Sequence, residues 1–297
     1  MQNINGILLL DKPSGITSNR VLQRVRSLIN AKKGGHTGSL DPFATGMLPL
    51  CFGEATKISH YLLNEKKTYS VEVKFGVSTS TGDIDGEVTG SSKIKEYSKD
   101  QWKKILNEFE GKSEQIPPMY SALRYKGKRL YELARKGEIV DRAAREIEIF
   151  SMDLVDLSKD MINFEITCSK GTYIRVLAED IAKKLGMLGH VSQLRRKTVG
   201  NFCESKMVKL TVLEDLSQNN KPAISDYFIT IDEALTEFSV VNLNDLQSSK
   251  FRNGQQLEFN THFDDKVKVF DHNNNLVGIA YKKNKNILAP KRIFHLS

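Results

Sequence analysis

The sequence predicts a mixed α/β protein that ends in a small all-β module. Residues 69–75 and 162–168 alternate apolar and polar side chains, which is typical of strands with one buried face. Residues 18–29 and 175–185 space their apolar side chains as amphipathic helices do. Residues 236–297 instead hold short apolar runs separated by turn residues. With 297 residues, the chain is long enough for one large domain or two.

The N-terminal part begins with a predicted buried strand. The apolar run at residues 7–10 leads into DKPSG, a turn sequence. A helix is expected next, with apolar residues at positions 21, 22, 25, 28 and 29 and with Ser18 as its N-cap. The following stretch, GGHTGSLDPFATGML at 34–48, is too rich in glycine for a regular element.

Turn residues mark the ends of the later elements. Asp85 and Gly86 follow the strand at 69–75 and predict a hairpin turn. Gly186 closes the helix at 175–185 as its C′ residue. The polar residues at 217–222 predict a loop or a linker.

The C-terminal module is predicted from three short apolar runs. Strands are expected at 267–270, 276–281 and 293–296. The sequence HNNN at 272–275 is expected to form the turn between the first two.

Charge and cysteine content narrow the class of protein. The chain has 44 Lys and Arg against 36 Asp and Glu, a formal net charge of +8, which favours a polyanionic partner or, alternatively, a solvated basic surface. Its three cysteines form no C-x-x-C pair and its six histidines no H-x-x-x-H pair, so we expect a reduced compartment and no metal site. No apolar run reaches the length of a signal peptide core or a membrane span, so we expect a cytoplasmic protein.

Asp41 is the single carboxylate of the glycine-rich stretch at 34–48. Followed by Pro42, it has the pattern of a helix N-cap and N1 position, because its carboxylate can accept the free N–H groups of a first helical turn. If Asp41 is instead catalytic, it would act alone, as a nucleophile or as an anchor, because residues 40–50 contain no second carboxylate. A buried nucleophilic carboxylate needs a cation beside it to stay ionised.

A candidate for that cation is Arg175 in the sequence GTYIR. It lies at a predicted strand-to-helix junction, where a side chain can be held rigidly, although an arginine at a helix start is more often a surface residue. Tyr69 and Tyr173 are likewise explained either by packing in the core or by a functional role.

Residues 121–145 form the most basic stretch of the chain. They contain eight Lys and Arg against three acidic residues, with Tyr125 and Tyr131 among them and Tyr120 just before. Cations that meet phosphates and rings that stack on bases suit RNA, whereas the alternative is a solvated basic helix. The sequence LRRK at 194–197 adds a smaller basic cluster.

Together these stretches resemble the bacterial tRNA pseudouridine-55 synthase (TruB) family. The resemblance rests on LLLDKPSGITS, GGHTGSLDPFATGMLP, GEATK, PPMYSALRYKGKRLYELAR, SKGTYIR and HVSQLRR, in this order, and covers nearly the whole chain. Two positions depart from the family pattern: Gly34 and Gly35 precede His36 where one bulky residue and one glycine are expected, and Phe43 replaces a leucine.

The resemblance implies a fold and an activity. The fold is an α/β catalytic domain around a bent mixed sheet at 1–235, with an RNA-binding insertion at about 121–145, followed by a small PUA-like β-barrel at 236–297. The activity is an isomerisation that converts one uridine in the T-loop of tRNA to pseudouridine without cofactor or metal. The partner would be the tRNA T-stem-loop, with no membrane and no obligate protein partner, and we expect a monomer.

Site residues follow by position in the matching motifs. Asp41 would be the nucleophile, Arg175 would pair with it, and Tyr69 would stack on the target base and take part in proton transfer. His36 would fill the space left by the flipped nucleotide. The other residues carried over are Tyr173 and Leu194, which would line the uridine pocket, and Lys12, Pro13 and Lys57, which would support the site.

Two other functions remain open at this stage. A non-catalytic RNA-binding protein would use the same surface, but retention of Asp41, Tyr69 and Arg175 favours the enzyme. A guide-RNA-dependent relative of the same fold would need partner proteins, whereas the basic insertion at 121–145 favours unaided tRNA binding. The sequence leaves open whether Asp41 would attack the sugar C1′ or the base C6.

Overall fold

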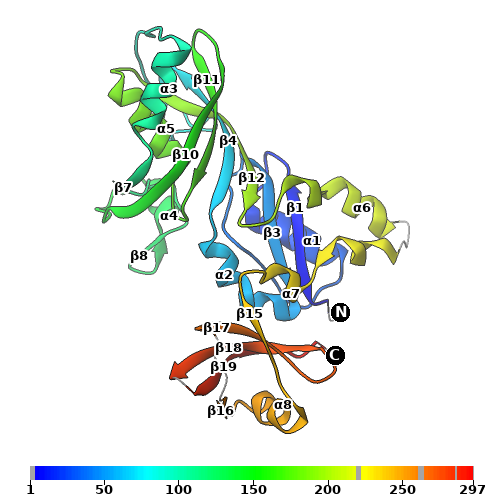
Figure 1. The fold of residues 1–297 in the computed structure, drawn as a ribbon. Helices are drawn as coiled ribbons and strands as arrows, with labels where there is room; N and C mark the ends of the chain where they lie inside the picture. Colours follow the sequence, from blue (N-terminus) through cyan, green and yellow to red (C-terminus); the bar gives the residue numbers. More distant parts are fainter. Residues whose placement is uncertain (1–3, 219–221, 260–263, 285, 297) are drawn as a thin grey trace.

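A mixed sheet runs through the larger part of the molecule (Figure 1). The computed structural model describes residues 4–218, 222–259, 264–284 and 286–296. Within these ranges ten strands form the sheet. Eight of them pair in the order β13-β1-β3-β12-β4-β11-β10-β7, and β2 pairs with β3 and β14 with β1. β1 pairs with β13, and β3 with β12, in parallel; the other pairings are antiparallel. The strands are β1 (Gly6–Lys12), β2 (Gly34–His36), β3 (Thr45–Phe52), β4 (Lys67–Phe75), β7 (Gly111–Gln115), β10 (Arg145–Leu157), β11 (Met161–Cys168), β12 (Gly189–Val199), β13 (Val208–Lys209) and β14 (Phe228–Ile229).

The sheet is bent as well as mixed, as expected. Register shifts interrupt the pairing of β12 with β4 at Val191/Gln193 and again at Arg196/Thr198. Such bulges insert an extra residue into one strand and increase its local twist. The β4, β11 and β10 end of the sheet therefore turns away from the β1 and β3 end (Figure 1).

Helices cover the sheet and connect its strands. Apolar residues of α5 and α3 pack with β4, β11 and β12 in one core cluster, and those of α1 pack with β1 and β3 in another. The helical elements are α1 (Ser18–Leu28), η1 (Gly53–Ile58), α2 (Ser59–Asn64), α3 (Lys99–Asn107), α4 (Leu130–Ala134), α5 (Ile174–Lys184), η2 (Glu204–Lys206), α6 (Leu210–Gln218), η3 (Pro222–Tyr227), α7 (Ile231–Ala234) and α8 (Asp245–Arg252). None of the helices in the described ranges is both long and apolar enough to cross a membrane.

The strongest periodic patterns are confirmed. The alternation at 69–75 becomes β4, which lies between β11 and β12, and that at 162–168 becomes β11. The helix expected at 175–185 is α5, and Gly186 follows it with φ of +65°, as a C′ glycine does. These elements bury a whole face, so their sequence period records the burial directly.

The predicted cap of α1 is wrong by one residue. Thr17 is the N-cap and accepts the N–H of Arg20, whereas Ser18 is the first helical residue. The Ser18 hydroxyl instead donates to the carbonyl of Leu40 and accepts the Leu40 N–H, at 2.9 and 2.8 Å. Ser18 therefore ties the helix to the chain immediately before Asp41.

The alternative interpretation of Asp41 as a helix N-cap is wrong. Asp41 and Pro42 lie in a turn, closed by the Ala44 N–H on the Asp41 carbonyl at 3.2 Å, and β3 begins three residues after Pro42. No described helix follows this turn, so the Asp41 carboxylate has no helical N–H groups to accept.

The hairpin expected at Asp85 and Gly86 is present. Strands β5 (Val77–Thr79) and β6 (Val88–Ser91) pair in antiparallel fashion on either side of it. The connection runs from 80 to 87, longer than a two-residue turn, and it carries Asp83 inward to a buried position.

The basic stretch at 121–145 is not one long helix. It holds a short hairpin of β8 (Arg124–Tyr125) and β9 (Lys128–Arg129), then the five-residue α4 and an exposed segment before β10. Gly127 has φ of +85°, a conformation that favours glycine in so tight a turn.

The C-terminal module is a curled, PUA-like sheet. Its described strands pair in the order β15-β17-β18-β19-β16, and no pairing among these residues joins β15 to β16, so the sheet forms a half-barrel. The strands are β15 (Ser239–Asn242), β16 (Leu257–Glu258), β17 (Lys266–Phe270), β18 (Leu276–Asn284) and β19 (Ile287–Ile293).

Two of the three strands predicted here are confirmed, at β17 and β18, and the third is wrong. The last strand covers 287–293 rather than 293–296. Phe294 is fully buried in the core cluster that also holds Ile58 and Leu235, so its apolar side chain packs against the larger part of the molecule. Of the loop expected at 217–222, residues 217 and 218 instead end α6 and residue 222 begins η3, while 219–221 lie outside the described residues.

Candidate active site

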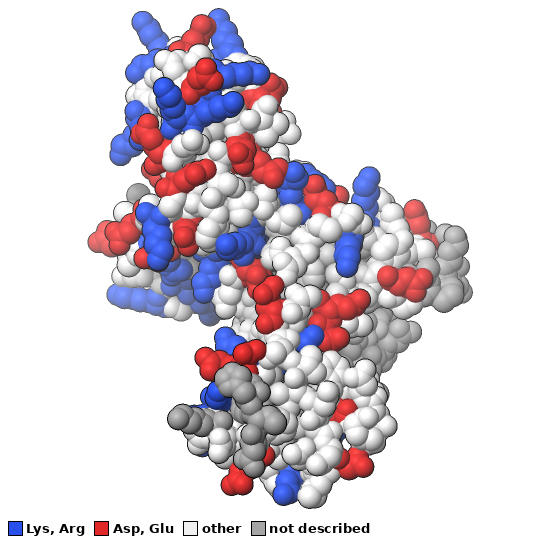
Figure 2. Space-filling model, viewed as in Figure 1, with Lys and Arg blue, Asp and Glu red and all other residues white. Residues whose placement is uncertain are grey.

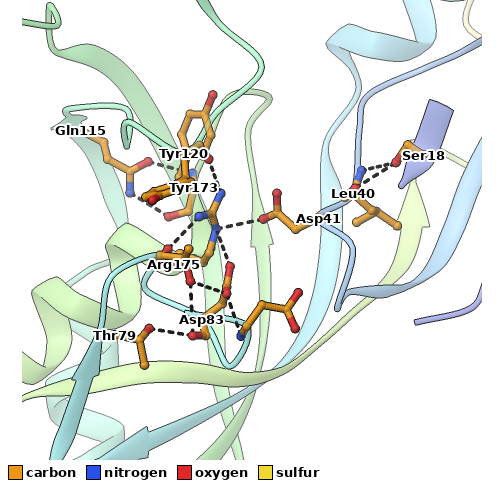
Figure 3. A network of polar contacts seen from close by, with 11 residues as sticks. Ser18, Leu40, Asp41, Thr79, Asp83, Gln115, Tyr120, Tyr173 and Arg175 are labelled. Atoms are coloured by element: carbon orange, nitrogen blue, oxygen red, sulfur yellow. Dashed lines mark hydrogen bonds and ion pairs between the residues drawn. The ribbon is translucent and has the colours of Figure 1, made fainter. Parts of the chain in front are cut away.

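Asp41 and Arg175 form an ion pair between the two ends of the bent sheet. The Asp41 Oδ2 lies 2.9 Å from the Arg175 Nε, and Figure 3 shows the two side chains pointing toward each other from opposite sides. The Arg175 side chain is 5% exposed, while that of Asp41 is 37% exposed. The carboxylate is thus held by a buried cation and still has an open side.

Backbone carbonyls and a second carboxylate hold Arg175 in place. Its Nη1 donates to the carbonyl of Thr81 and its Nη2 to that of Tyr120, both at 2.7 Å. The Asp83 Oδ2 lies 3.5 Å from the Arg175 Nε and its side chain is 6% exposed. The guanidinium is therefore saturated on three sides, so it cannot swing away from Asp41 without leaving buried acceptors unpaired.

Gln115 sets where α5 begins and so where Arg175 points. Its side chain is buried at the end of β7, accepts the Tyr173 N–H at 2.7 Å and donates to the Tyr173 carbonyl at 3.1 Å. Tyr173 is the extended N-cap residue of α5, and its own side chain makes no cap hydrogen bond. The amide of Gln115 thus stands in for a strand partner at this junction (Figure 3).

Lys12 supports the Asp41 turn from beneath. Its fully buried ammonium donates to the carbonyls of Pro13, Ile16 and Pro42, at 2.8, 2.7 and 3.0 Å. Burial lowers the pKa of Lys12 to about 8, and the Asp41 carboxylate opposes that shift. One cation therefore joins the end of β1 to the turn that carries Asp41.

Burial is the main influence on the pKa of Asp41 and raises it above the usual value. The Arg175 guanidinium opposes this shift, the Asp83 carboxylate adds to it, and Lys12 opposes it more weakly. Arg175 therefore stabilises the ionised form that a nucleophile needs.

A cavity of about 660 Å³ opens above the ion pair. It brings together six of the residues predicted for the site, which are His36, Asp41, Tyr69, Tyr173, Arg175 and Leu194. Residues 121–123 with Arg129 form one wall, so the start of the basic stretch reaches the cavity. The cavity has ionic groups at its floor and aromatic and aliphatic side chains around them, a composition that suits a flat polar ring.

Tyr69 contributes a ring and a hydroxyl from β4. Its side chain is 8% exposed, burial raises its pKa, and the positive charge of Arg196 opposes the shift. The hydroxyl is therefore protonated at neutral pH. Arg196 also donates to the carbonyls of Met47 and Gly38, at 2.7 and 3.2 Å, so it joins β12 to β3 and to the chain that precedes Asp41.

The three predicted supporting residues, Lys12, Pro13 and Lys57, all lie outside the lining of the cavity. The Pro13 carbonyl accepts a hydrogen bond from the Lys12 ammonium, so Pro13 supports the Asp41 turn through Lys12. Lys57 lies in η1, pairs with Glu54 at 2.5 Å and donates to the carbonyl of Ile293 in the C-terminal module. The structure therefore does not bring Lys57 to the ion pair.

Three residues that hold the site together, Asp83, Gln115 and Arg196, were not predicted from the sequence. Asp83 lies in an ordinary turn sequence, and Gln115 precedes a Pro-Pro pair, so neither has a pattern that indicates a site. Arg196 was visible only as part of the basic cluster LRRK, yet it is 1% exposed and binds carbonyls. No group of three or more His, Cys, Asp or Glu side chains among the described residues could hold a metal ion.

Three family models match the chain between residues 26 and 294. The model described as "TruB family pseudouridylate synthase (N terminal domain)" matches residues 26–174, just over half of the chain. The chain belongs to the TruB pseudouridylate synthase family. The TruB C-terminal models match residues 175–237 and 239–294 of this TruB chain.

Curated relatives of this TruB chain share its full length. The tRNA pseudouridine synthase B of Nitrosococcus oceani is 43% identical over 293 residues, covering 98% of this chain and 95% of that protein. The protein of the same name from Hydrogenovibrio crunogenus is 43% identical over 297 residues, covering 100% and 96%.

Solved structures share the fold of this TruB chain. A Cbf5–Nop10–Gar1 complex matches with a TM-score of 0.74 at 21% identity, covering 98% of this chain and 85% of that one. An H/ACA RNP bound to a substrate RNA containing 2′-deoxyuridine matches with a TM-score of 0.72, also at 21% identity. At this identity the likeness concerns the fold alone.

Proposed function

We propose that this protein isomerises a uridine of tRNA to pseudouridine, at position 55 in the T-loop. The observation that carries the proposal is the Asp41–Arg175 ion pair at the floor of a cavity also lined by Tyr69. Membership of the TruB family and the names of its full-length relatives support tRNA as the substrate.

The proposed reaction needs only groups that the chain supplies. The N1–C1′ glycosidic bond breaks and a C5–C1′ bond forms; C5 loses a proton and N1 gains one, so no oxidant, reductant or cofactor is consumed. Asp41 acts as the nucleophile, at C1′ or at C6, and leaves when the new carbon–carbon bond is in place. Its open side faces the cavity, where the reacting carbon would lie.

Arg175 and Tyr69 have separate roles in this proposal. Arg175 holds the Asp41 carboxylate ionised and aimed, through the fixed directions of its N–H groups. Tyr69 stacks its ring on the extruded base while it turns and, as a neutral phenol, exchanges a proton with it. The detached uracil must not escape, which favours the aromatic and aliphatic cavity wall.

The target base must leave the folded T-loop to reach the cavity. Extrusion of a base costs a few kcal/mol, about what stacking on an aromatic ring returns. His36 lies at the end of β2, lines the cavity and would take the place of the extruded nucleotide. The basic hairpin β8–β9 and α4 would hold the RNA backbone, and Figure 2 shows Lys and Arg side chains gathered on this side of the molecule.

We further propose that the chain works alone and in two parts. Residues 1–235 would form the catalytic domain and 236–297 the PUA-like domain, in keeping with the family model that matches 239–294. The basic stretch at 121–145 supports unaided binding of tRNA by a monomer, without guide RNA or partner protein.

Release of tritium from tRNA labelled at the uridine C5 tests the proposal. The wild-type protein is expected to release one tritium per tRNA, and Asp41→Asn none, with tRNA affinity within about tenfold of wild type. Asp153→Asn, an exposed carboxylate on β10, is the matched control and should be fully active. Turnover by Asp41→Asn would exclude Asp41 as the nucleophile, and release that persists when U55 is replaced by C would exclude the position.

A further inference from the structure

Two buried cations lie on the Tyr69 side of the catalytic cavity. Lys67 of β4 and Arg196 of β12 both line the cavity, and their exposed fractions are 6% and 1%. Neither forms an ion pair with a carboxylate in the described ranges. Arg175, by contrast, is shared between two carboxylates. Positive charge is therefore unbalanced next to Tyr69.

The sheet places the two cations beside the Tyr69 ring. Lys67 precedes Tyr69 by two residues on β4, and the burial pattern of this strand puts both on the same face. Arg196 is the Cα partner of Tyr69 in the pairing of β12 with β4. Side chains two residues apart on a strand lie about 7 Å apart, and directly opposite ones about 5 Å apart. A base stacked on the Tyr69 ring would therefore lie close to both cations.

An irregularity in β12 lies next to Arg196. The register of β12 with β4 shifts between Arg196 and Thr198, so Lys197 is the extra residue. Bulges of this kind re-aim the side chains beside them and are common near active sites. Lys197 pairs with Glu165 at 2.5 Å, whereas Arg196 is buried in the cavity lining. The bulge thus separates a neutralised cation from one that keeps its charge for the cavity.

Backbone carbonyls hold both cations without using all their donors. The Lys67 ammonium donates to the carbonyls of Leu63 and Glu65, at the end of α2, at 2.9 and 2.5 Å. An ammonium has three N–H donors and a guanidinium five, and Arg196 donates to two carbonyls. Lys12 is different, because it binds three carbonyls and lies outside the cavity lining. Lys67 and Arg196 therefore have donors for a ligand beyond these backbone contacts.

The proposed reaction places negative charge on the uracil ring. If Asp41 attacks C1′, the N1–C1′ bond breaks and its electron pair stays on the ring, shared by N1, O2 and O4. If Asp41 adds to C6, the electron pair of the C5–C6 double bond moves toward O4. In either course the ring is negatively charged before the rearrangement is complete. Fixed donors and cations in a site that excludes water stabilise such a charge strongly.

We propose that Lys67 and Arg196 form an anion site that stabilises the negative charge developing on the uracil oxygen atoms. The inference rests on the proposed function, because it assumes that the uracil lies on the Tyr69 ring. Both residues supply charge and N–H donors, and no proton or electron pair passes to or from either. Burial of a cation without a counter-charge is costly, and the anionic ring would supply that counter-charge during the reaction.

Replacement of Lys67 tests the proposal on an isolated T-stem-loop. In Lys67→Met, kcat for tritium release should fall about 10²- to 10³-fold, the usual loss when one preorganised donor is removed. KM should stay within about threefold of wild type, because the charge develops only after binding. Lys67→Arg restores the charge and should recover at least about tenfold of the lost kcat. Arg196→Lys should likewise lose less kcat than Arg196→Met.

Lys95→Met is the matched control. Lys95 is an exposed lysine that donates to the carbonyl of Leu185, at the end of α5, at 2.7 Å. Its replacement removes the same kind of contact with a helix end as Lys67→Met does at α2, but away from the cavity lining. It should therefore leave kcat unchanged. Thermal melting of each variant shows whether the fold is intact.

The dependence of kcat/KM on pH separates a charge from a packing role. Burial, with repulsion from Arg196, lowers the pKa of Lys67 to about 8, so its charge is present below this pH and is lost as the pH rises through it. In wild type, kcat/KM should fall between about pH 7 and 9, and in Lys67→Met it should fall less steeply. The other charged or titratable groups near Lys67 are Glu65, Tyr69, Cys168 and Lys170.

Four results would overturn the inference. They are a kcat for Lys67→Met within about threefold of wild type, a rise in KM without a loss of kcat, a loss of kcat in Lys95→Met equal to that in Lys67→Met, and an equally steep fall of kcat/KM with pH in Lys67→Met. The last would assign the titration to another group, such as Lys12. If Lys67→Met does not fold, Lys67→Arg carries the test, because arginine stays charged: a fall near pH 8 that persists there contradicts the role of the Lys67 charge. Failure of the wild type to release tritium would instead refute the proposed function.

Discussion

Replacing Arg175 tests how Asp41 is held. The guanidinium donates in three directions, to the carbonyls of Thr81 and Tyr120 at 2.7 Å each and to Asp41 at 2.9 Å. A lysine at this position keeps the charge but has one compact ammonium, which cannot reach all three acceptors. In Arg175→Lys at least two charge-assisted hydrogen bonds are therefore lost.

The size of the effect follows from those contacts. Each hydrogen bond to a charged group contributes about 1.5–3 kcal/mol, so two contribute about 3–6 kcal/mol. If this positioning energy is expressed at the transition state, kcat falls roughly 10²- to 10⁴-fold, at 1.36 kcal/mol for each factor of ten. KM for tRNA should change little, because Arg175 lies under the cavity and not on its rim.

The pH dependence separates charge from geometry. Burial raises the pKa of Asp41 and Arg175 opposes the shift, so activity that needs the carboxylate is present above this pKa and is lost as the pH falls through it. Arg175→Gln removes the cation, so the acid limb of kcat should move to higher pH, whereas Arg175→Lys should move it less.

Single-turnover tritium release measured across pH gives both quantities. A kcat for Arg175→Lys within threefold of wild type would refute the claim that three directed contacts aim Asp41. An acid limb in Arg175→Gln at the wild-type position would refute the claim that Arg175 keeps Asp41 ionised.

Three further predictions concern Gly46, Lys12 and the basic stretch at 121–145. Gly46→Ala should lower the free energy of unfolding by at least about 2 kcal/mol in chemical denaturation, because φ is +96° and the new Cβ would lie 2.3 Å from the Arg196 carbonyl oxygen. The control Gly127→Ala, at φ of +85° with nothing within 4 Å of the new Cβ, should destabilise the protein less. Equal losses of stability in the two variants would contradict the predicted clash. Burial lowers the pKa of Lys12 from 10.5 to about 8, so the contribution of this group to the free energy of unfolding should rise between pH 8 and 10.5. Over this range the free energy of unfolding of the wild-type protein should rise more steeply with pH than that of Lys12→Met. Parallel curves of unfolding free energy against pH would contradict the pKa shift. Affinity for tRNA should fall steeply with salt in filter binding, and a flat response would remove the role of the basic stretch at 121–145.

The sequence predicted elements best where one face is buried along its whole length. The periods of β4, β11 and α5 were visible because each packs in one core cluster, and a buried face imposes its spacing on the chain. The sequence did not predict the correct hydrogen-bond partner where a polar side chain has two possible ones. Ser18 could cap its own helix or bind Leu40, and only the approach of the turn at 40–44 decides between them.

The same limit applies to the candidate site. Asp41 and Arg175 were expected to pair, because a buried nucleophile needs a cation, and the structure places them 2.9 Å apart. Asp83 and Gln115 were not expected, because they act through space on residues 92 and 58 positions away in the chain. No local pattern records a contact of that kind.

By itself, the sequence determined the α/β class, the family and the cavity residues that lie in its motifs, because these depend on short-range periods and contiguous residues. The tertiary structure alone decided that Arg175 is shared between two carboxylates and that Arg196 is buried. It also decided that Lys57 joins the two parts of the chain. These features arise where segments far apart in sequence pack together, since charge burial and hydrogen-bond geometry are set by all the surrounding elements at once.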